Sequence, residues 1–233
     1  MFDLNESTMS LHISNKNANL IYNDCSIYIN QIMPKIVDHE QYRKELLDKC
    51  FDLFAQKGYG SITMRQIAEG LKVSTGTLYH YFPSKQALFE QLAQEICEQD
   101  LSTALAELEG AQTLQESMEA LGSYLVKNKD YFIKWTYIWI DFCQHKDSKE
   151  MLNNSVFKRT NQRYQQAACD FVGIQDPVLA SFVLSFVNGL ILEKLWGDET
   201  IDFMEQCALL GKMLTVYLPQ HTVVVTNKIG FES

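Results

Sequence analysis

Residues 61–89, SITMRQIAEGLKVSTGTLYHYFPSKQALF, constrain the fold of this chain more than any other stretch. Thr63 precedes apolar residues spaced as on one face of a helix, and Gln66 follows three positions later, which is the pattern of a capping box. The apolar spacing breaks and then resumes at a second N-cap candidate, Ser74. The stretch therefore predicts a helix-turn-helix, with one short helix after Thr63 and another after Ser74.

A further helix is expected directly after Pro83, because proline disfavours helical geometry in the residue before it and Ser84 can cap a new helix. Lys85 then lies in a first helical turn, where its charge opposes the positive end of the helix dipole. A bound anion would resolve this conflict, and we interpret Lys85 as a candidate phosphate contact. A solvated surface lysine is the alternative.

The outward face of the second short helix is able to approach DNA, since its residues are small or can hydrogen-bond and none is acidic. The run FAQKGYGSITMRQIAEGLKVSTGTLYHYFPSKQALF, residues 54–89, resembles the DNA-binding signature of the TetR family of transcriptional regulators. The resemblance implies groove or base-edge contacts for Arg65, Thr75, Gly76, Thr77 and Tyr79. It implies mainly phosphate contacts for Thr63, Ser74, His80, Tyr81 and Lys85.

Lys72 departs from the family pattern, because many relatives carry glycine in this turn. If the position needs a left-handed backbone, lysine costs about 1 kcal/mol. The fold can tolerate such a cost.

The formal net charge of −9 is unevenly distributed along the chain. Residues 34–97 hold eight Lys or Arg and eight Asp or Glu, whereas residues 98–233 hold eleven and eighteen. The acidic excess therefore lies away from the helix-turn-helix. One face can bind DNA while the rest of the protein repels phosphate.

Helical periodicity continues through the chain and no segment alternates like a strand, so we expect an all-α fold. Helices are expected at residues 39–57, 85–109, 114–128, 130–144, 149–172, 177–196 and 201–218. The expected domains are a helix-turn-helix DNA-binding domain at 33–84, a helical effector-binding and dimerisation domain at 85–218, and a tail at 219–233. Residues 1–32 are interpreted as disordered or as preceding a true start at Met33, with a packed or DNA-following arm as the alternative.

Aromatic residues gather in the expected second domain. Core packing explains any one of them, but together they can line an apolar ligand cavity closed by a few polar groups, such as Thr136, Gln162 and Gln166. In the TetR family this region holds the inducer, so the resemblance implies a small apolar or aromatic effector. The candidate ligand-binding residues are Tyr131, Trp135, Trp139, Phe142, Phe157, Tyr164, Phe182, Phe186 and Asn188.

The last two expected helices carry broad apolar faces, and Gly189 would allow another backbone to approach closely. Alone, such faces only require burial. In TetR-like proteins these helices pair with their symmetry mates, so the resemblance implies a homodimer. Two recognition helices about 34–36 Å apart can read a palindromic operator.

Other classes of site find little support in the sequence. The six cysteines lack a CxxC pair and are interpreted as reduced thiols, with a redox sensor as the alternative. Asp141 and His145, four residues apart, favour a hydrogen bond over a metal site. No GxSxG or HExxH motif occurs. We therefore expect no enzyme, metal or cofactor, and a soluble, cytoplasmic protein without a membrane partner.

These patterns favour a DNA-binding transcriptional regulator, most often a repressor in this family, that responds to a ligand. A protein-interaction module that has lost DNA binding is a second hypothesis, which the intact candidate contacts disfavour. A helical enzyme using the aromatic cavity is a third, which the missing catalytic constellation disfavours.

Overall fold

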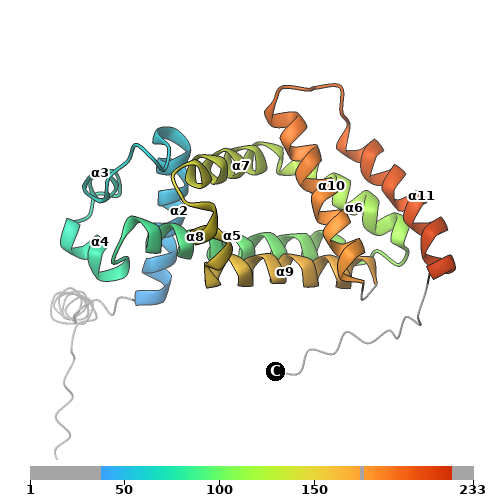
Figure 1. Ribbon diagram of the computed structural model, residues 1–233, viewed down its shortest axis with the longest axis horizontal. Coiled ribbons are helices and arrows are strands. Elements are labelled where there is room, and N and C mark those ends of the chain that lie inside the picture. The colour runs from blue at the N-terminus through green and yellow to red at the C-terminus, as the bar shows by residue number, and fades with distance from the viewer. Residues whose placement is uncertain (1–37, 174–175, 222–233) are drawn as a thin grey trace, which may run out of the picture. The chain divides into compact units, whose positions relative to one another are not determined.

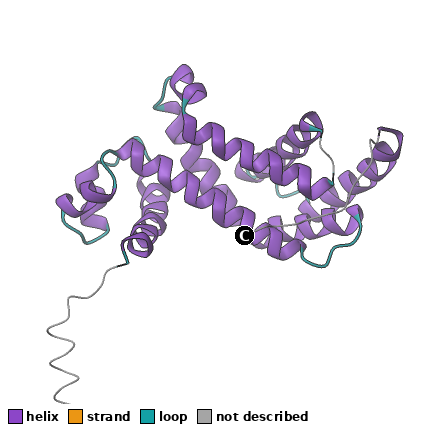
Figure 2. Cartoon of the chain, turned by 90° about the horizontal axis from the view of Figure 1, so that it is seen from below, coloured by secondary structure: helices purple, strands orange, loops and turns teal. Residues whose placement is uncertain are grey.

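The computed structural model describes residues 38–173 and 176–221, and every regular element in this part of the chain is a helix (Figure 2). The all-α expectation is therefore confirmed for these residues. The chain divides into two compact units, residues 1–42 and 43–233. The expectations for residues 1–32 and for most of the tail at 219–233 lie outside the described residues, and the domain boundaries at 33–84 and 85–218 stay predictions.

Helix α2 (His39–Lys57) begins in the first unit and continues into the second, with the bounds that the sequence predicts. At its start the Asp38 carboxylate accepts hydrogen bonds from the backbone N–H groups of Glu40 and Gln41 at 3.0 and 3.1 Å. At its end Gly58 adopts a left-handed φ of 77°, which stops the helix.

The helix-turn-helix forms as predicted, from α3 (Met64–Gly70) and α4 (Thr75–Tyr81). The capping box is present: Thr63 Oγ1 accepts from the backbone N–H of Gln66 at 3.3 Å, and Gln66 Oε1 accepts from that of Thr63 at 2.9 Å. Ser74 Oγ accepts from the backbone N–H of Thr77 at 2.9 Å. Local hydrogen bonds therefore fix both helix starts.

Lys72 adopts the left-handed backbone conformation that the sequence analysis considers for this turn, with a φ of 57°. Its N–H donates to the Glu69 carbonyl and that of Val73 donates to the Ala68 carbonyl, both at 3.0 Å, which is the bonding pattern of a Schellman motif. The turn needs this conformation to end α3, so the chain accepts the expected cost of about 1 kcal/mol.

The chain continues as α5 (Lys85–Leu108), whose first turn is capped by Ser84, with Ser84 Oγ accepting from the backbone N–H of Ala87 at 3.0 Å. Beyond it, further helices follow along the chain (Figure 1). They are α6 (Leu114–Lys127), α7 (Lys129–Gln144), α8 (Ser148–Asn153), α9 (Ser155–Val172), α10 (Pro177–Leu195) and α11 (Phe203–His221). Their bounds lie close to the expected ranges except over residues 149–172.

The prediction of one helix over residues 149–172 is wrong, because the helix breaks at Asn154 into α8 and α9. The Asn154 side chain accepts from the backbone N–H groups of Val156 and Phe157 at 2.9 and 3.2 Å and so caps α9. Its amide also donates to Glu90 Oε1 on α5 at 2.6 Å. A contact distant in sequence thus helps to hold the break.

The C-terminal helices share a core in which α11 packs closely on α6. Glycines permit this approach: a Cβ at Gly122 would lie 3.1 Å from the Cα of Met204, and one at Gly211 would lie 3.1 Å from the Cβ of Met118. Two clusters of buried side chains fill the space between α6, α10 and α11. Their buried members are Met118, Val183, Leu210, Leu214, Leu125, Leu190, Ile191, Phe203 and Cys207.

Phe89 on α5 lies at the centre of an aromatic cluster that joins the helix-turn-helix region to the helices beyond it. Its ring is fully buried and stacks on Phe142 of α7 with centroids 3.9 Å apart. Edge contacts at 5.9 and 5.2 Å reach Phe54 and Tyr59. The cluster therefore packs α2, α5 and α7 together.

Among the described residues, α10 is the one helix long and apolar enough to cross a membrane, with a mean hydropathy of 1.7 over its best window. Core helices of water-soluble proteins pass the same test. In this structure α10 contributes Val183, Leu190 and Ile191 to the buried clusters.

Candidate nucleic-acid interface and cavity

The outward face of α4 is the candidate nucleic-acid interface. Leu78 and the C-cap residue Phe82 are fully buried and anchor the helix, while Tyr79 keeps 49% of its surface exposed. Six more of the predicted contacts are exposed, and Thr77, Tyr81 and Lys85 are half-buried. The exposed six are Thr63, Arg65, Ser74, Thr75, Gly76 and His80.

Two features of this face bear on how closely a partner can approach it: the hydroxyl groups of Ser74 and Thr77, and the space around Gly76. Ser74 Oγ and Thr77 Oγ1 lie 2.8 Å apart and share a hydrogen bond, which orients both hydroxyl groups. A Cβ built on Gly76 would meet only Ser74 Oγ, at 3.7 Å. Packing within the chain therefore does not require glycine at position 76, whereas a closely approaching backbone would.

Lys85 has partners within the chain. Its ammonium group donates to the backbone carbonyls of Tyr59 at 2.7 Å and Ile62 at 2.9 Å, and it lies 4.4 Å from the centroid of the Tyr59 ring. Burial lowers the pKa of Lys85, and the nearby Asp141 carboxylate opposes this shift. Carbonyl oxygens thus resolve the conflict with the helix dipole without an external anion, and the phosphate contact stays a prediction.

Replacing Lys85 with alanine is expected to lower the free energy of unfolding by about 1–3 kcal/mol, because two carbonyl groups lose a charged donor. Urea unfolding followed by circular dichroism measures this change. The variant Lys49→Ala, which alters an exposed lysine of α2, is the control and should change stability by less than about 0.5 kcal/mol.

The same variant separates two roles of Lys85 in DNA binding. Loss of a phosphate contact lowers the slope of log affinity against log salt concentration by about 1. A purely structural role leaves the slope of the folded variant unchanged. An unaltered stability would contradict the bonding described above.

The end of α7 is tied to the loop between α2 and α3. The backbone N–H of Gly60 donates to Asp141 Oδ2 at 3.0 Å, and Asp141 Oδ1 lies 3.5 Å from Nδ1 of His145. Asp141 and His145 are the pair that the sequence predicts to interact. Within the described residues, no three His, Cys, Asp or Glu side chains gather as metal ligands.

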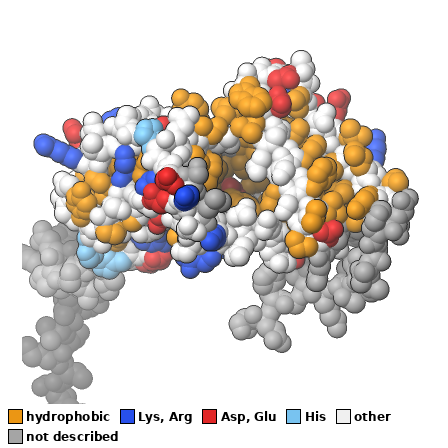
Figure 3. All heavy atoms as spheres, in the orientation of Figure 1, with side chains coloured by type: hydrophobic (Ala, Val, Ile, Leu, Met, Phe, Trp, Pro, Cys, Tyr) orange, Lys and Arg blue, Asp and Glu red, His pale blue; other side chains and the backbone are white. Residues whose placement is uncertain are grey.

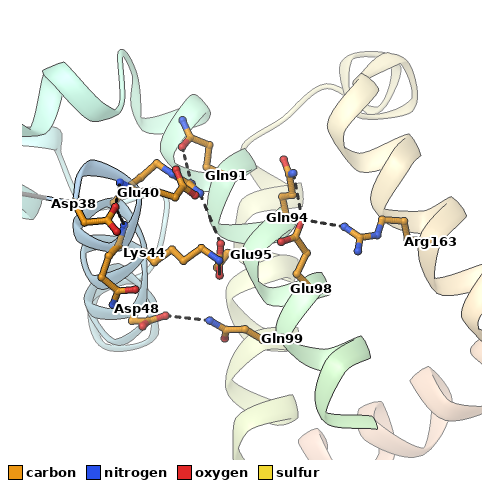
Figure 4. Close-up of polar contacts among 12 residues, drawn as sticks. Asp38, Glu40, Lys44, Asp48, Gln91, Gln94, Glu95, Glu98, Gln99 and Arg163 are labelled. Atoms are coloured by element: carbon orange, nitrogen blue, oxygen red, sulfur yellow. Dashed lines mark hydrogen bonds and ion pairs between the residues drawn. The ribbon is translucent and has the colours of Figure 1, made fainter. Parts of the chain in front are cut away.

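Helix α5 bridges α2 on one side and α9 on the other (Figure 4). Lys44 of α2 pairs with the buried Glu95 at 3.1 Å, while Arg163 of α9 pairs with Glu98 at 2.9 Å. The two pairs therefore link α5, the helix that follows α4 in the chain, to α2 and to α9.

A cavity of about 520 Å³ lies between α5, α6, α7, α9 and α10. Its wall is mostly apolar, and the molecular face in Figure 3 is hollowed near its centre between hydrophobic side chains. The volume falls within the range of about 300–1,000 Å³ that is typical of small-molecule sites. A ligand-sized space is therefore present in the region where the sequence predicts one.

The structure brings five of the nine predicted ligand-binding residues to the cavity wall: Trp135, Trp139, Phe157, Tyr164 and Asn188. The other four lie elsewhere. Tyr131 stacks on Phe51 at 5.4 Å, Phe142 on Phe89 at 3.9 Å, Phe182 is 49% exposed, and Phe186 packs against the buried clusters. Of the candidate polar residues, Thr136 lines the wall, while Gln162 and Gln166 are exposed.

Sequence reasoning missed the contribution of α5 to the cavity. Asp100 and Leu101 line the wall, as do Thr160 and Asn161 of α9. Asp100 continues the buried stripe of α5, three residues after Cys97, so a helical projection of α5 could have found it.

The five described cysteines are free thiols. Burial raises the pKa of Cys50 and of Cys207 to about 12 and that of Cys97 to about 11. Because the thiolate is the reactive form, these shifts disfavour redox chemistry at neutral pH. Cys25 lies outside the described residues.

Residues 46–92 match the family model of bacterial regulatory proteins of the tetR family. A 74-residue stretch is 39% identical to the transcriptional repressor KstR of Mycolicibacterium smegmatis, covering 31% of this chain and 36% of that protein. The chain spans less than half the length of several curated relatives that it matches in this way. The residues matched by the family model include the whole helix-turn-helix, α3 and α4.

Longer matches are weaker in sequence. The chain is 22% identical over 196 residues to the probable acrEF/envCD operon repressor of Escherichia coli K12, covering 78% of this chain and 89% of that protein. The structure of FadR from Bacillus subtilis in complex with stearoyl-CoA is similar, with a TM-score of 0.56 at 16% identity, covering 73% of this chain and 96% of that one. The fold is thus shared along most of the chain.

Proposed function

We propose, from the premise that this chain belongs to the TetR family of bacterial regulatory proteins, that it is a transcriptional repressor. It represses transcription by binding a palindromic operator. It releases the operator when an effector occupies the cavity. The observation that carries the proposal is the outward face of α4. This face is largely exposed and has no acidic side chain, and Ser74 caps the start of the helix. Such a helix fits the major groove.

The effector is proposed to be a small, largely apolar molecule. Support comes from the mostly apolar cavity wall. The FadR structure in complex with stearoyl-CoA adds by analogy only that a protein of similar fold binds a ligand. Trp135 and Trp139 line the cavity from α7, and Asp141 on the same helix holds Gly60 near the helix-turn-helix. Binding can release DNA only if the effector prefers the arrangement of α5 and α7 that the operator disfavours.

A homodimer through α10 and α11 is part of the proposal. Several large apolar side chains of these helices are exposed, and a Cβ at Gly189 would meet no atom within 4 Å. Contiguous exposed apolar surface marks interaction sites. The exposed residues are Val178, Phe182, Trp196, Met204, Leu209, Met213, Val216 and Tyr217.

Replacing Met213, which is 56% exposed on α11, with glutamate is expected to weaken self-association about tenfold, because it places a charge in an apolar interface. Sedimentation equilibrium over a protein dilution series measures the change. Val126→Glu alters a residue that is 52% exposed on α6 and serves as the control. Equal effects of the two variants would exclude α11 as the interface.

The operator itself is tested with DNA from upstream of the gene in a gel-shift assay repeated over a salt series. Saturable binding that survives competitor DNA supports the repressor. A folded protein that binds no promoter fragment would instead support an interaction module that keeps the fold. The protein is proposed to act in the cytoplasm, where its DNA lies.

A further inference from the structure

Asp100 is a buried carboxylate in the wall of the cavity. It keeps 9% of its surface exposed and comes from α5, the helix that leads from α4 into the rest of the protein. It is the one formally charged residue among the lining residues that the structure describes, and none of these is lysine, arginine or histidine. The wall therefore contains one acidic side chain and no basic side chain beside it.

Two tyrosines hold this carboxylate in place. The Tyr131 hydroxyl donates to Asp100 Oδ1 at 2.9 Å, and the Tyr164 hydroxyl donates to Oδ2 at 2.7 Å. Tyr124 donates to the backbone carbonyl of the same residue at 3.3 Å. An ionised carboxylate has about four acceptor sites, so these bonds leave capacity for a further donor.

The environment of Asp100 destabilises the ionised form of its carboxyl group. Burial raises the pKa of the carboxyl group, while the hydrogen bonds from Tyr164 and Tyr131 partly oppose this shift. A buried charge is stable when it has a charged partner as well as hydrogen bonds. Because the cavity wall supplies no cation, a ligand can supply one.

The rest of the wall suits the body of such a ligand. Phe132, Trp135 and Trp139 contribute aromatic surface, and a cation over an aromatic ring is attracted by its electron-rich face. Val183, Leu184 and Ile191 contribute aliphatic surface. By the same electrostatics, the wall disfavours a carboxylate or phosphate ligand.

We infer that the cavity selects an organic cation with an apolar or aromatic body, its positive charge lying beside the Asp100 carboxylate. This inference rests on the proposed function, in which the cavity holds the effector. It adds the charge of the ligand to that proposal. It also gives Asp100 the role of a specificity-determining residue, with Tyr131 and Tyr164 as positioning residues.

Tetraphenylphosphonium and tetraphenylborate test the inference, because they have nearly the same size and shape and carry opposite permanent charges. Isothermal titration of the full-length protein should show at least about tenfold tighter binding of the cation. Quenching of tryptophan fluorescence provides a second measurement, since Trp135 and Trp139 line the cavity. Equal affinities, preference for the anion, or no binding of either ion would overturn the inference.

The variant Asp100→Asn keeps the shape of the side chain and removes its charge. It should bind tetraphenylphosphonium about tenfold more weakly and tetraphenylborate no more weakly than the wild type. Asp130→Asn removes the same charge from an exposed position of α7 outside the cavity wall and should keep the preference for the cation. If Asp100→Asn folds, as circular dichroism would show, and still prefers the cation, the inference is wrong. If it does not fold, the preference of the wild-type protein alone decides.

Failure of the inference is distinguishable from failure of the proposed function. A protein that releases operator DNA with a neutral or anionic ligand, and not with tetraphenylphosphonium, remains an effector-controlled repressor with a different ligand class. A protein that binds the cation preferentially but no DNA overturns the repressor and leaves the charge selectivity of the cavity intact.

Discussion

Replacing Phe89 with alanine is expected to lower the free energy of unfolding by about 3–5 kcal/mol, the largest stability effect that we predict. The ring is fully buried and contacts aromatic side chains from three other helices. Removing it leaves a cavity that fixed neighbours such as Phe142 cannot fill. Urea unfolding at one protein concentration, followed by circular dichroism, measures the loss.

Two further variants sharpen this experiment. Phe89→Leu retains part of the apolar volume and should lose clearly less stability than Phe89→Ala. Tyr137→Ala truncates an aromatic residue that is 59% exposed on α7, and it should change stability by less than about 0.5 kcal/mol. A loss below about 1 kcal/mol for Phe89→Ala would show that the aromatic cluster does not hold α5 against α2 and α7.

Replacing Gly76 with glutamate is expected to weaken operator binding by at least about 100-fold while the protein stays folded. A Cβ at this position meets only Ser74 Oγ at 3.7 Å, so the fold has room for the side chain. An acidic residue also suits the first turn of a helix. On the outward face of α4, however, it would meet the phosphates and block close approach of the DNA.

Fluorescence anisotropy with a labelled operator fragment at fixed salt gives the affinity. Ser102→Glu adds the same charge on an exposed position of α5 and should leave binding within about twofold of the wild type. This control separates a local effect at α4 from the general effect of a more acidic protein. If Gly76→Glu binds within tenfold of the wild type, α4 does not enter the groove.

The helix-turn-helix could be predicted because its determinants are local. Thr63, Gln66 and Ser74 bond to backbone groups within three residues, and the structure shows these bonds. Lys72 likewise takes the left-handed conformation that ends α3. Interactions of this range are encoded by spacing alone.

Asn154 and Lys85 show two features of the structure that the spacing of residues along the sequence does not predict. Asn154 interrupts a periodic pattern, and Glu90, 64 residues earlier in the chain, binds its amide. Lys85 is satisfied by carbonyls of residues 59 and 62, so its partners are not visible from its place in a first helical turn. Both outcomes depend on contacts between segments that lie far apart in the sequence, and helical periodicity does not encode such contacts.

The sequence by itself determined much of the local structure of this protein: most of the helices, the N-caps at Thr63, Ser74 and Ser84, and the outward residues of α4. Only the tertiary structure decided which aromatic side chains lie in the core and which line the cavity. Helical periodicity predicts that a residue is buried, but it does not predict which side chains the residue contacts. Asp100 illustrates the difference. Its contact with Tyr131 and Tyr164 requires α5, α7 and α9 to pack together, and that packing places one acidic residue in the wall of the cavity.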